Sequence, residues 1–108
     1  MFNRLTDTES LENLFAVSLE KPIAIFKHSN TCPISSDVRD ALSACPVTLF
    51  EIIVQTERSL SNLVAERTGV RHQSPQALVI FKGEVLYNAS HYDIDGDDIA
   101  RVMSSSTK

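Results

Sequence analysis

The fold is decided by residues 22–35, which read PIAIFKHSNTCPIS. The stretch opens on an apolar run, Pro22 to Lys27, which is typical of a strand buried on both faces. Polar residues 28–30 interrupt the run, and Cys32 follows just ahead of an amphipathic helix pattern that starts near Ser36. The stretch therefore predicts a thiol at the N-terminus of a helix that follows a buried strand.

A cysteine at that location is suited to nucleophilic chemistry. The unpaired N–H groups and the positive dipole end of a helix N-terminus favour the thiolate form. A dithiol redox motif would carry its second cysteine where this chain has Ser35. A Cys-x-x-Ser site can attack a disulfide, but it cannot release its partner by a second local attack. The motif therefore predicts monothiol chemistry at Cys32.

Composition bounds the remaining possibilities. With 108 residues, of which 43% are hydrophobic, the chain is expected to form one domain over 1–108. Ten basic and 14 acidic side chains give a net charge of −4 without a basic cluster, so we expect neither nucleic acid nor a membrane surface as partner. The N-terminus lacks the apolar core of a signal peptide, and we expect a cytoplasmic protein.

Hydrophobic periodicity and turn residues predict helices alternating with strands over most of the chain. In order, the expected elements are a helix capped by Thr6, a strand at 23–26, a helix ending before Pro46 with Cys45 on its buried stripe, a strand at 47–54, a helix at 57–68 with Gly69 as its C-cap, strands at 77–81 and 85–89 joined by a turn at 82–84, and a short helix capped by Asp95 before a frayed polar tail at 104–108.

This order of elements is that of the thioredoxin fold. An N-terminal helix is followed by β-α-β-α-β-β-α around a four-stranded mixed sheet, in which the first two strands are parallel and the last two form a hairpin. In open α/β sheets, ligands and reactive groups gather beyond the carboxyl ends of parallel strands. Cys32 is predicted to lie at that edge.

The dipeptide Ser74-Pro75 directly precedes the third predicted strand. From the residues alone, Pro75 fits the ordinary start of a strand as well as it fits a specialised loop. An X-Pro bond cannot be assigned as cis from sequence, because only about 5% of such bonds in folded proteins are cis. The role of this dipeptide therefore stays open at this level.

Three separated segments resemble the monothiol bacilliredoxins, a family of small thioredoxin-like proteins: residues 27–35 (KHSNTCPIS), 72–76 (HQSPQ) and 88–94 (NASHYDI). The resemblance implies a thiol–disulfide oxidoreductase that removes bacillithiol, a low-molecular-weight thiol, from protein mixed disulfides, with Cys32 as the attacking thiol. Bacillithiol is then a co-substrate, and no tightly bound cofactor is expected.

The resemblance also implies a cis Ser74-Pro75 bond in a loop that faces the cysteine, where the backbone of Ser74 pairs with an incoming client chain. The candidate substrate-binding residues are Thr31, Pro33, Ser35, Ser74 and Pro75.

Asn30 and His91 are candidates for modulating the ionisation of the thiol, although Asn30 also fits a simple turn. The expected partners are S-thiolated client proteins, the low-molecular-weight thiol and another redoxin for recycling.

Other readings of the cysteines and histidines are less specific. Cys45 lies at the far end of the predicted helix, beyond disulfide reach of Cys32, and is expected to pack in the core. The histidines at positions 28, 72 and 91 lie near the active face but lack the compact spacing of a zinc site, so no metal is expected.

Two other functions remain open. Cys-x-x-Ser sites also occur in glutaredoxin-like adaptors that bind a thiol, or hold an iron–sulfur cluster between two protomers, without turnover of their own. A third reading is a stress-associated binding domain with a vestigial thiol, which the shortage of charged residues around Cys32 mildly supports. Colour in the purified protein would discriminate the cluster adaptor from the redoxin.

Overall fold

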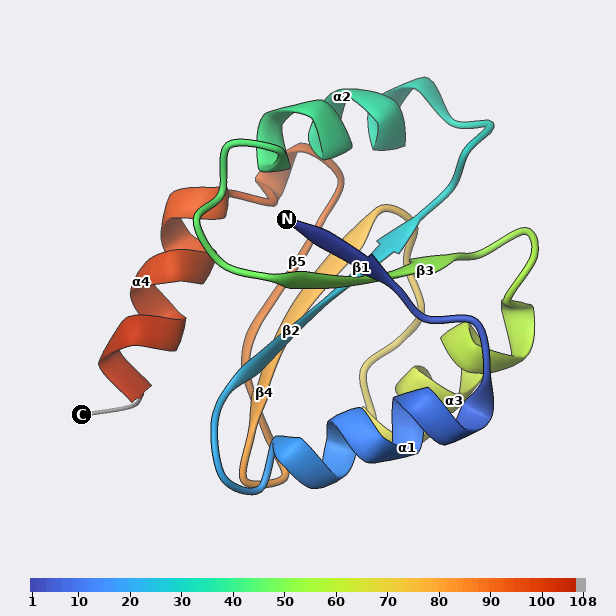
Figure 1. The fold of residues 1–108 in the computed structure, drawn as a ribbon. Helices are drawn as coiled ribbons and strands as arrows, with labels where there is room; N and C mark the ends of the chain where they lie inside the picture. Colours follow the sequence, from blue (N-terminus) through green and yellow to red (C-terminus); the bar gives the residue numbers. More distant parts are fainter. Residues whose placement is uncertain (107–108) are drawn as a thin grey trace.

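The computed structural model describes residues 1–106 and shows a mixed sheet flanked by helices (Figure 1). Its elements are, in chain order, β1 (Phe2–Arg4), α1 (Thr8–Val17), β2 (Ile23–His28), α2 (Pro33–Leu42), β3 (Leu49–Ile53), α3 (Arg58–Thr68), β4 (Gln76–Phe81), β5 (Glu84–Ser90), the short 3-10 helix η1 (His91–Asp93) and α4 (Gly96–Ser106). The five strands lie in the order β1-β3-β2-β4-β5. Within the described residues, no helix is both long and apolar enough to cross a bilayer.

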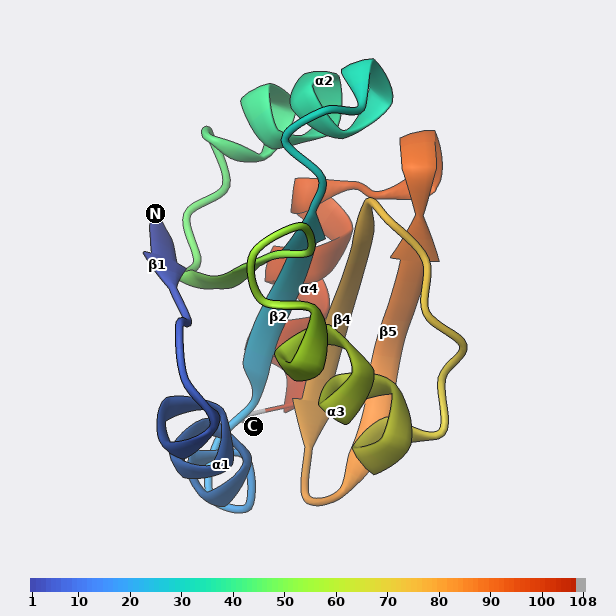
Figure 2. The same cartoon turned by 90° about the vertical axis from the view of Figure 1, so that its right-hand side faces the viewer.

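Two apolar cores lie on opposite faces of this sheet. Helices α1 and α3 cover one face, and α2 and α4 cover the other (Figures 1 and 2). Central strand β2 contributes Ile23 and Ile25 to the first core and Ala24 and Phe26 to the second. Burying an Ile or Phe side chain fully contributes about 1.5–3 kcal/mol. This two-sided burial explains why the predicted strand is a continuous apolar run.

Strand register brings three loops to one edge of the sheet. Strand β2 runs parallel to β3, with His28 opposite Ile53, and antiparallel to β4, with Lys27 opposite Gln76. The carboxyl ends of β2 and β3 therefore lie beside the start of β4. The loop that carries Cys32 consequently meets the segment that ends in Pro75.

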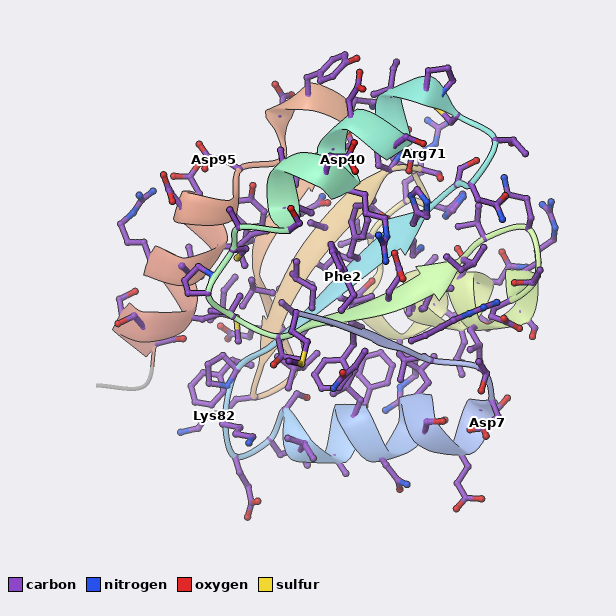
Figure 3. All side chains as sticks on the ribbon, turned by 45° about the horizontal axis from the view of Figure 1, so that its top comes forward. Phe2, Asp7, Asp40, Arg71, Lys82 and Asp95 are labelled. Atoms are coloured by element: carbon purple, nitrogen blue, oxygen red, sulfur yellow. The ribbon has the colours of Figure 1, made fainter. Side chains whose placement is uncertain are left out.

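The sheet has one strand more than the four predicted. Strand β1 pairs in parallel with β3, with Phe2 opposite Leu49. It spans only three residues at the sheet edge, and Phe2 alone is partly buried, so it carries no detectable alternation. In Figure 3, Phe2 lies over the sheet, where its ring approaches that of Phe26 at a centroid distance of 6.0 Å.

Two helix starts differ from the prediction. Helix α1 is capped by Asp7, whose carboxylate accepts the Ser10 N–H at 2.8 Å, and not by Thr6 (Figure 3). Both residues favour N-caps, and the carboxylate also complements the positive end of the helix dipole. Helix α2 begins at Pro33 and not near Ser36, because proline is well suited to the first helical position.

Two helix ends differ as well. Helix α2 ends at Leu42, so Cys45 follows the helix instead of closing it. Helix α4 continues to Ser106 through the first residues of the predicted frayed tail, and the rest of that tail, 107–108, lies outside the described residues. The predicted C-cap at Gly69 is confirmed, since its φ of 71° is a left-handed conformation that glycine adopts without strain.

Candidate functional site

Cys32 is the N-cap residue of α2 and is half-buried. Its carbonyl accepts the first helical hydrogen bond, from the Ser36 N–H at 3.1 Å, while Pro33 occupies the next position. The Cys32 side chain makes no capping hydrogen bond. The thiol therefore lies at the N-terminal end of the helix without being used to close it.

Ser35 lies beneath the loop, at the position where a dithiol protein would carry its second cysteine. It is fully buried, and its hydroxyl accepts the Ser29 N–H at 3.0 Å and lies 2.7 Å from His28 Nδ1. Burial is the largest effect on the pKa of His28 and lowers it. The negative charge of Glu51 raises this pKa, and the positive charge of Arg39 lowers it further. Ser35 thus ties the first turn of α2 to the end of β2, and its hydroxyl is already engaged.

Gln55 holds the loop from the side and was missed by the sequence analysis. Its amide nitrogen donates to Ser29 Oγ at 2.6 Å and to Thr31 Oγ1 at 2.9 Å. Its amide oxygen accepts the backbone N–H of Asn30 at 3.2 Å. One signal could have identified it: a polar residue just beyond β3, the strand parallel to β2, where functional residues gather. Thr31 and Pro33 are exposed on the outer side of the same loop.

The segment before β4 faces Cys32 from the other side. The Ser74–Pro75 bond is cis, as the family resemblance implied. Ser74 and Cys32 line the same pocket, whereas Pro75 is buried and its carbonyl accepts the His91 N–H at 3.0 Å. His91 is therefore joined to the proline loop through its backbone, in a conformation with a φ of 56°.

The pocket beside Cys32 has a volume of about 240 Å³. Its lining combines polar and apolar surface from three parts of the chain. Besides Cys32 and Val54, it includes Ser29, Arg58, Ser61, Asn62, His72 and Ser74. A larger hollow of about 630 Å³ lies at the opposite end of β2, beside Pro22 and Ile23, away from the thiol.

Lys27 is buried directly behind this pocket. Its side chain is fully buried, and Nζ donates to the Ser61 carbonyl at 3.0 Å and lies 3.2 Å from His72 Nδ1. Burial lowers the pKa of Lys27 to about 8. The pKa of His72 is lowered by burial and by the positive charges of Lys27 and Arg58. The site thus contains more positive charge than the net charge of −4 would suggest.

Tyr92 provides an exposed aromatic ring above the site. Its hydroxyl donates to Asp37 Oδ2 at 2.9 Å and so connects η1 to α2. The hydrogen bond to Asp37 is the largest of the effects that raise the pKa of Tyr92, and the negative charge of Cys32 contributes to them. The phenol therefore stays protonated at neutral pH.

The second cysteine is buried as predicted, although it lies beyond the end of α2. Cys45 is buried in the core between α2 and α4, and its Sγ lies 3.5 Å from the Gly96 carbonyl. Both cysteines are free thiols. Among residues 1–106, no group of three or more His, Cys, Asp or Glu side chains is arranged to hold a metal ion.

Comparisons with known proteins agree with this geometry. The family model described as monothiol bacilliredoxin BrxC matches residues 3–99. A solved structure of a candidate oxidoreductase with a thioredoxin fold is 32% identical, with a TM-score of 0.82, over 94% of this chain and 92% of that chain.

More distant structures share the fold alone. The thioredoxin of Fasciola hepatica is 12% identical with a TM-score of 0.70, over 95% of this chain and 97% of that one. The thioredoxin of Trypanosoma brucei brucei is 8% identical with a TM-score of 0.73, over 99% and 91%. The predicted thioredoxin fold is therefore confirmed, and with a family match over nearly its whole length the chain belongs to the monothiol bacilliredoxins.

Proposed function

We propose that this protein is a monothiol thiol–disulfide oxidoreductase that removes bacillithiol from S-thiolated client proteins. The observation that carries the proposal is the placement of the two thiols. Cys32 is accessible at the start of α2, and Ser35 replaces the second cysteine of a dithiol motif, while Cys45 is buried in a core. The family match supports thiol–disulfide chemistry, and the identity of the thiol comes from the family description.

In the proposed reaction, the Cys32 thiolate attacks the bacillithiol sulfur of a client–S–S–bacillithiol disulfide. The new Cys32–bacillithiol S–S bond forms as the old one breaks, and the electron pair leaves on the client sulfur, which takes a proton from solvent. The client is reduced, and Cys32 is oxidised to a mixed disulfide. Reset needs a second free thiol, from the low-molecular-weight pool or from another redoxin, to attack this mixed disulfide.

The surrounding residues are assigned supporting roles. Ser74 offers its backbone to the client as a short added strand, beside the buried Pro75. Thr31 and Pro33 form the exposed rim that a client meets, and Ser35 positions the turn from below. These contacts do not depend on client side chains, which fits a broad client range.

We place this chemistry in the reducing cytoplasm, where mixed disulfides with small thiols need reversal. Asn30 and His91 remain the proposed modulators of the thiol, Asn30 through the loop held by Gln55 and His91 through the proline loop. No tightly bound cofactor is proposed.

The test is the rate at which an S-bacillithiolated client is reduced in excess bacillithiol, followed by intact mass of the client. We expect Cys32→Ser to abolish the reaction. Cys45→Ala should keep nearly the full rate at a stability cost of about 1–2 kcal/mol, because it removes only a buried sulfur. A folded Cys45→Ala protein as inactive as Cys32→Ser would refute the monothiol assignment.

A cluster adaptor would behave differently in the same preparation. Purified without oxygen, it would absorb visible light and lose that colour in Cys32→Ser. A colourless wild-type protein that reduces the client supports the redoxin. A coloured protein that leaves the client thiolated would replace it with the adaptor.

A further inference from the structure

The pocket beside Cys32 is small, and the charge that its described lining carries is positive. Arg58 lines it, and among residues 1–106 this arginine forms no ion pair with a carboxylate. No described residue of the lining is acidic. The nearest acidic neighbour in sequence, Glu57, is instead paired with Arg4 at 2.9 Å. An exposed arginine that pairs with no carboxylate of residues 1–106 thus lines the same pocket as Cys32.

The side chain of His72 can donate a hydrogen bond to a ligand in this pocket. A protonated lysine can only donate, so Lys27 Nζ at 3.2 Å makes His72 Nδ1 an acceptor. Ser61 Oγ, 3.0 Å from the same nitrogen, can donate to it as well. The neutral ring must then carry its proton on Nε2. Lys27 therefore fixes the tautomer of His72 from behind and leaves an N–H for a ligand.

Two further features suit an anion. The first residue of α3 is Arg58, and the N-cap of that helix has no side-chain hydrogen bond, so the pocket lies at a second helix N-terminus besides that of α2. The hydroxyl oxygen of Ser74 is buried and has no hydrogen-bond partner among the described residues. In Figure 2 the segment that carries Ser74 climbs past α3 toward α2, which brings these groups together.

We propose that this pocket binds a carboxylate of the low-molecular-weight thiol exchanged at Cys32, with Arg58 and His72 as its ligands and Ser74 Oγ as a further donor. The inference rests on the proposed exchange function and adds to it the residues that recognise the small thiol. A guanidinium binds a carboxylate in a bidentate, charge-assisted geometry. A volume of about 240 Å³ fits the acidic arm of a small molecule and is below the range of pockets for drug-sized ligands.

The test uses three symmetric disulfides that differ in charge: 3,3′-dithiodipropionate with two carboxylates, 2-hydroxyethyl disulfide without charge, and cystamine with two amines. Each reacts as Cys32–S⁻ + RSSR → Cys32–SSR + RS⁻, and intact mass gives the rate constant. The measured quantity is the ratio of the dicarboxylate rate constant to that of the neutral disulfide.

We expect Arg58→Gln to lower this ratio about fivefold, as the loss of one partly exposed charge-assisted contact would. Arg58→Lys should recover part of the ratio. The matched control is Arg101→Gln, on α4 at the opposite face of the sheet, which changes the net charge equally and should leave the ratio unchanged. Equal changes of this ratio in Arg58→Gln and Arg101→Gln would overturn the proposal, because the preference for the dicarboxylate would then come from the net charge of the protein and not from the pocket.

A second arm asks whether the carboxylate belongs to the client instead. Two peptides carry a 2-mercaptoethanol adduct on cysteine, with Asp or Asn beside it, and the effect of Arg58→Gln is measured on each. A loss confined to the Asp peptide, with the small-disulfide ratio unchanged, would contradict the proposal. If the proposed exchange function were wrong, Cys32 would react with none of the three disulfides. That result is distinct from a loss of the preference for the dicarboxylate.

Discussion

At the scale of single residues, Lys27 is the least expected feature of the molecule. It lies in the central strand with no exposed surface, and its ammonium group contacts a carbonyl and an imidazole instead of a carboxylate. Burial disfavours its charged form and lowers its pKa from 10.5 to about 8. At neutral pH the folded protein therefore holds a buried positive charge behind the site.

This charge predicts a pH-dependent stability. Between about pH 8 and 10.5 the unfolded chain binds a proton at Lys27 that the folded protein has released. The free energy of unfolding therefore rises with pH across this window, by up to about 3 kcal/mol from this group. Urea unfolding at several pH values should show the rise in the wild type relative to Lys27→Met, which lacks the group.

Lys21→Met is the control, since it removes an exposed lysine of the same length. A difference between wild type and Lys27→Met that stays constant from pH 7 to 10.5 would show that Lys27 carries no buried charge. The sequence placed Lys27 at the edge of the predicted strand, and only the structure shows that its side chain turns inward beneath α3.

At the scale of elements, the loop that carries Cys32 is held by Gln55, two residues beyond the end of β3. The Gln55 amide accepts a hydrogen bond from the Asn30 N–H and donates to the hydroxyls of Ser29 and Thr31. Together with the buried Ser35, these hydrogen bonds leave Cys32 little freedom to drift from the helix start. Gln55 therefore adds three hydrogen bonds from outside the loop to the one that Ser29 makes with Ser35.

Gln55→Ala should lower the free energy of unfolding by about 1–2 kcal/mol, because the three bonds are partly exposed to solvent. It should also slow the exchange reaction of Cys32, because the loop would sample other conformations. The comparison is Asn13→Ala, which removes an exposed amide from α1 and should alter neither quantity by more than about 0.5 kcal/mol or twofold. An unchanged exchange rate in Gln55→Ala would mean that the loop keeps its conformation without the hydrogen bonds of Gln55.

Elements were predictable where burial imposed a period on the sequence. Strand β2 and the hairpin of β4 and β5 follow from apolar runs bounded by turn residues, and Gly69 marked a helix end. Strand β1 could not be found in this way, since three residues at an edge bury only one side chain. The cap of α1 required a choice between two good capping residues, which tertiary geometry decides.

At the scale of the whole molecule, the sheet order brings the loops after β2 and β3 beside the segment before β4. The position of Cys32 at this edge was predictable from the β-α-β order. The pocket was not, because Arg58 on α3 and the segment that carries His72 and Ser74 meet Cys32 only in the folded chain. The sequence separation of Cys32, Arg58 and His72 does not indicate that they line one pocket.

In the proposed reaction one thiol, Cys32, takes the small thiol from a client, and no second cysteine resolves the resulting mixed disulfide. The most direct test mixes wild-type protein with one equivalent of an S-bacillithiolated client, quenches with acid after one turnover, and measures intact mass with peptide mapping. We expect a free client and one bacillithiol added to the peptide that contains Cys32. A Cys32–Cys45 disulfide, seen as a loss of two hydrogens, or an adduct on Cys45, would contradict the proposed reaction.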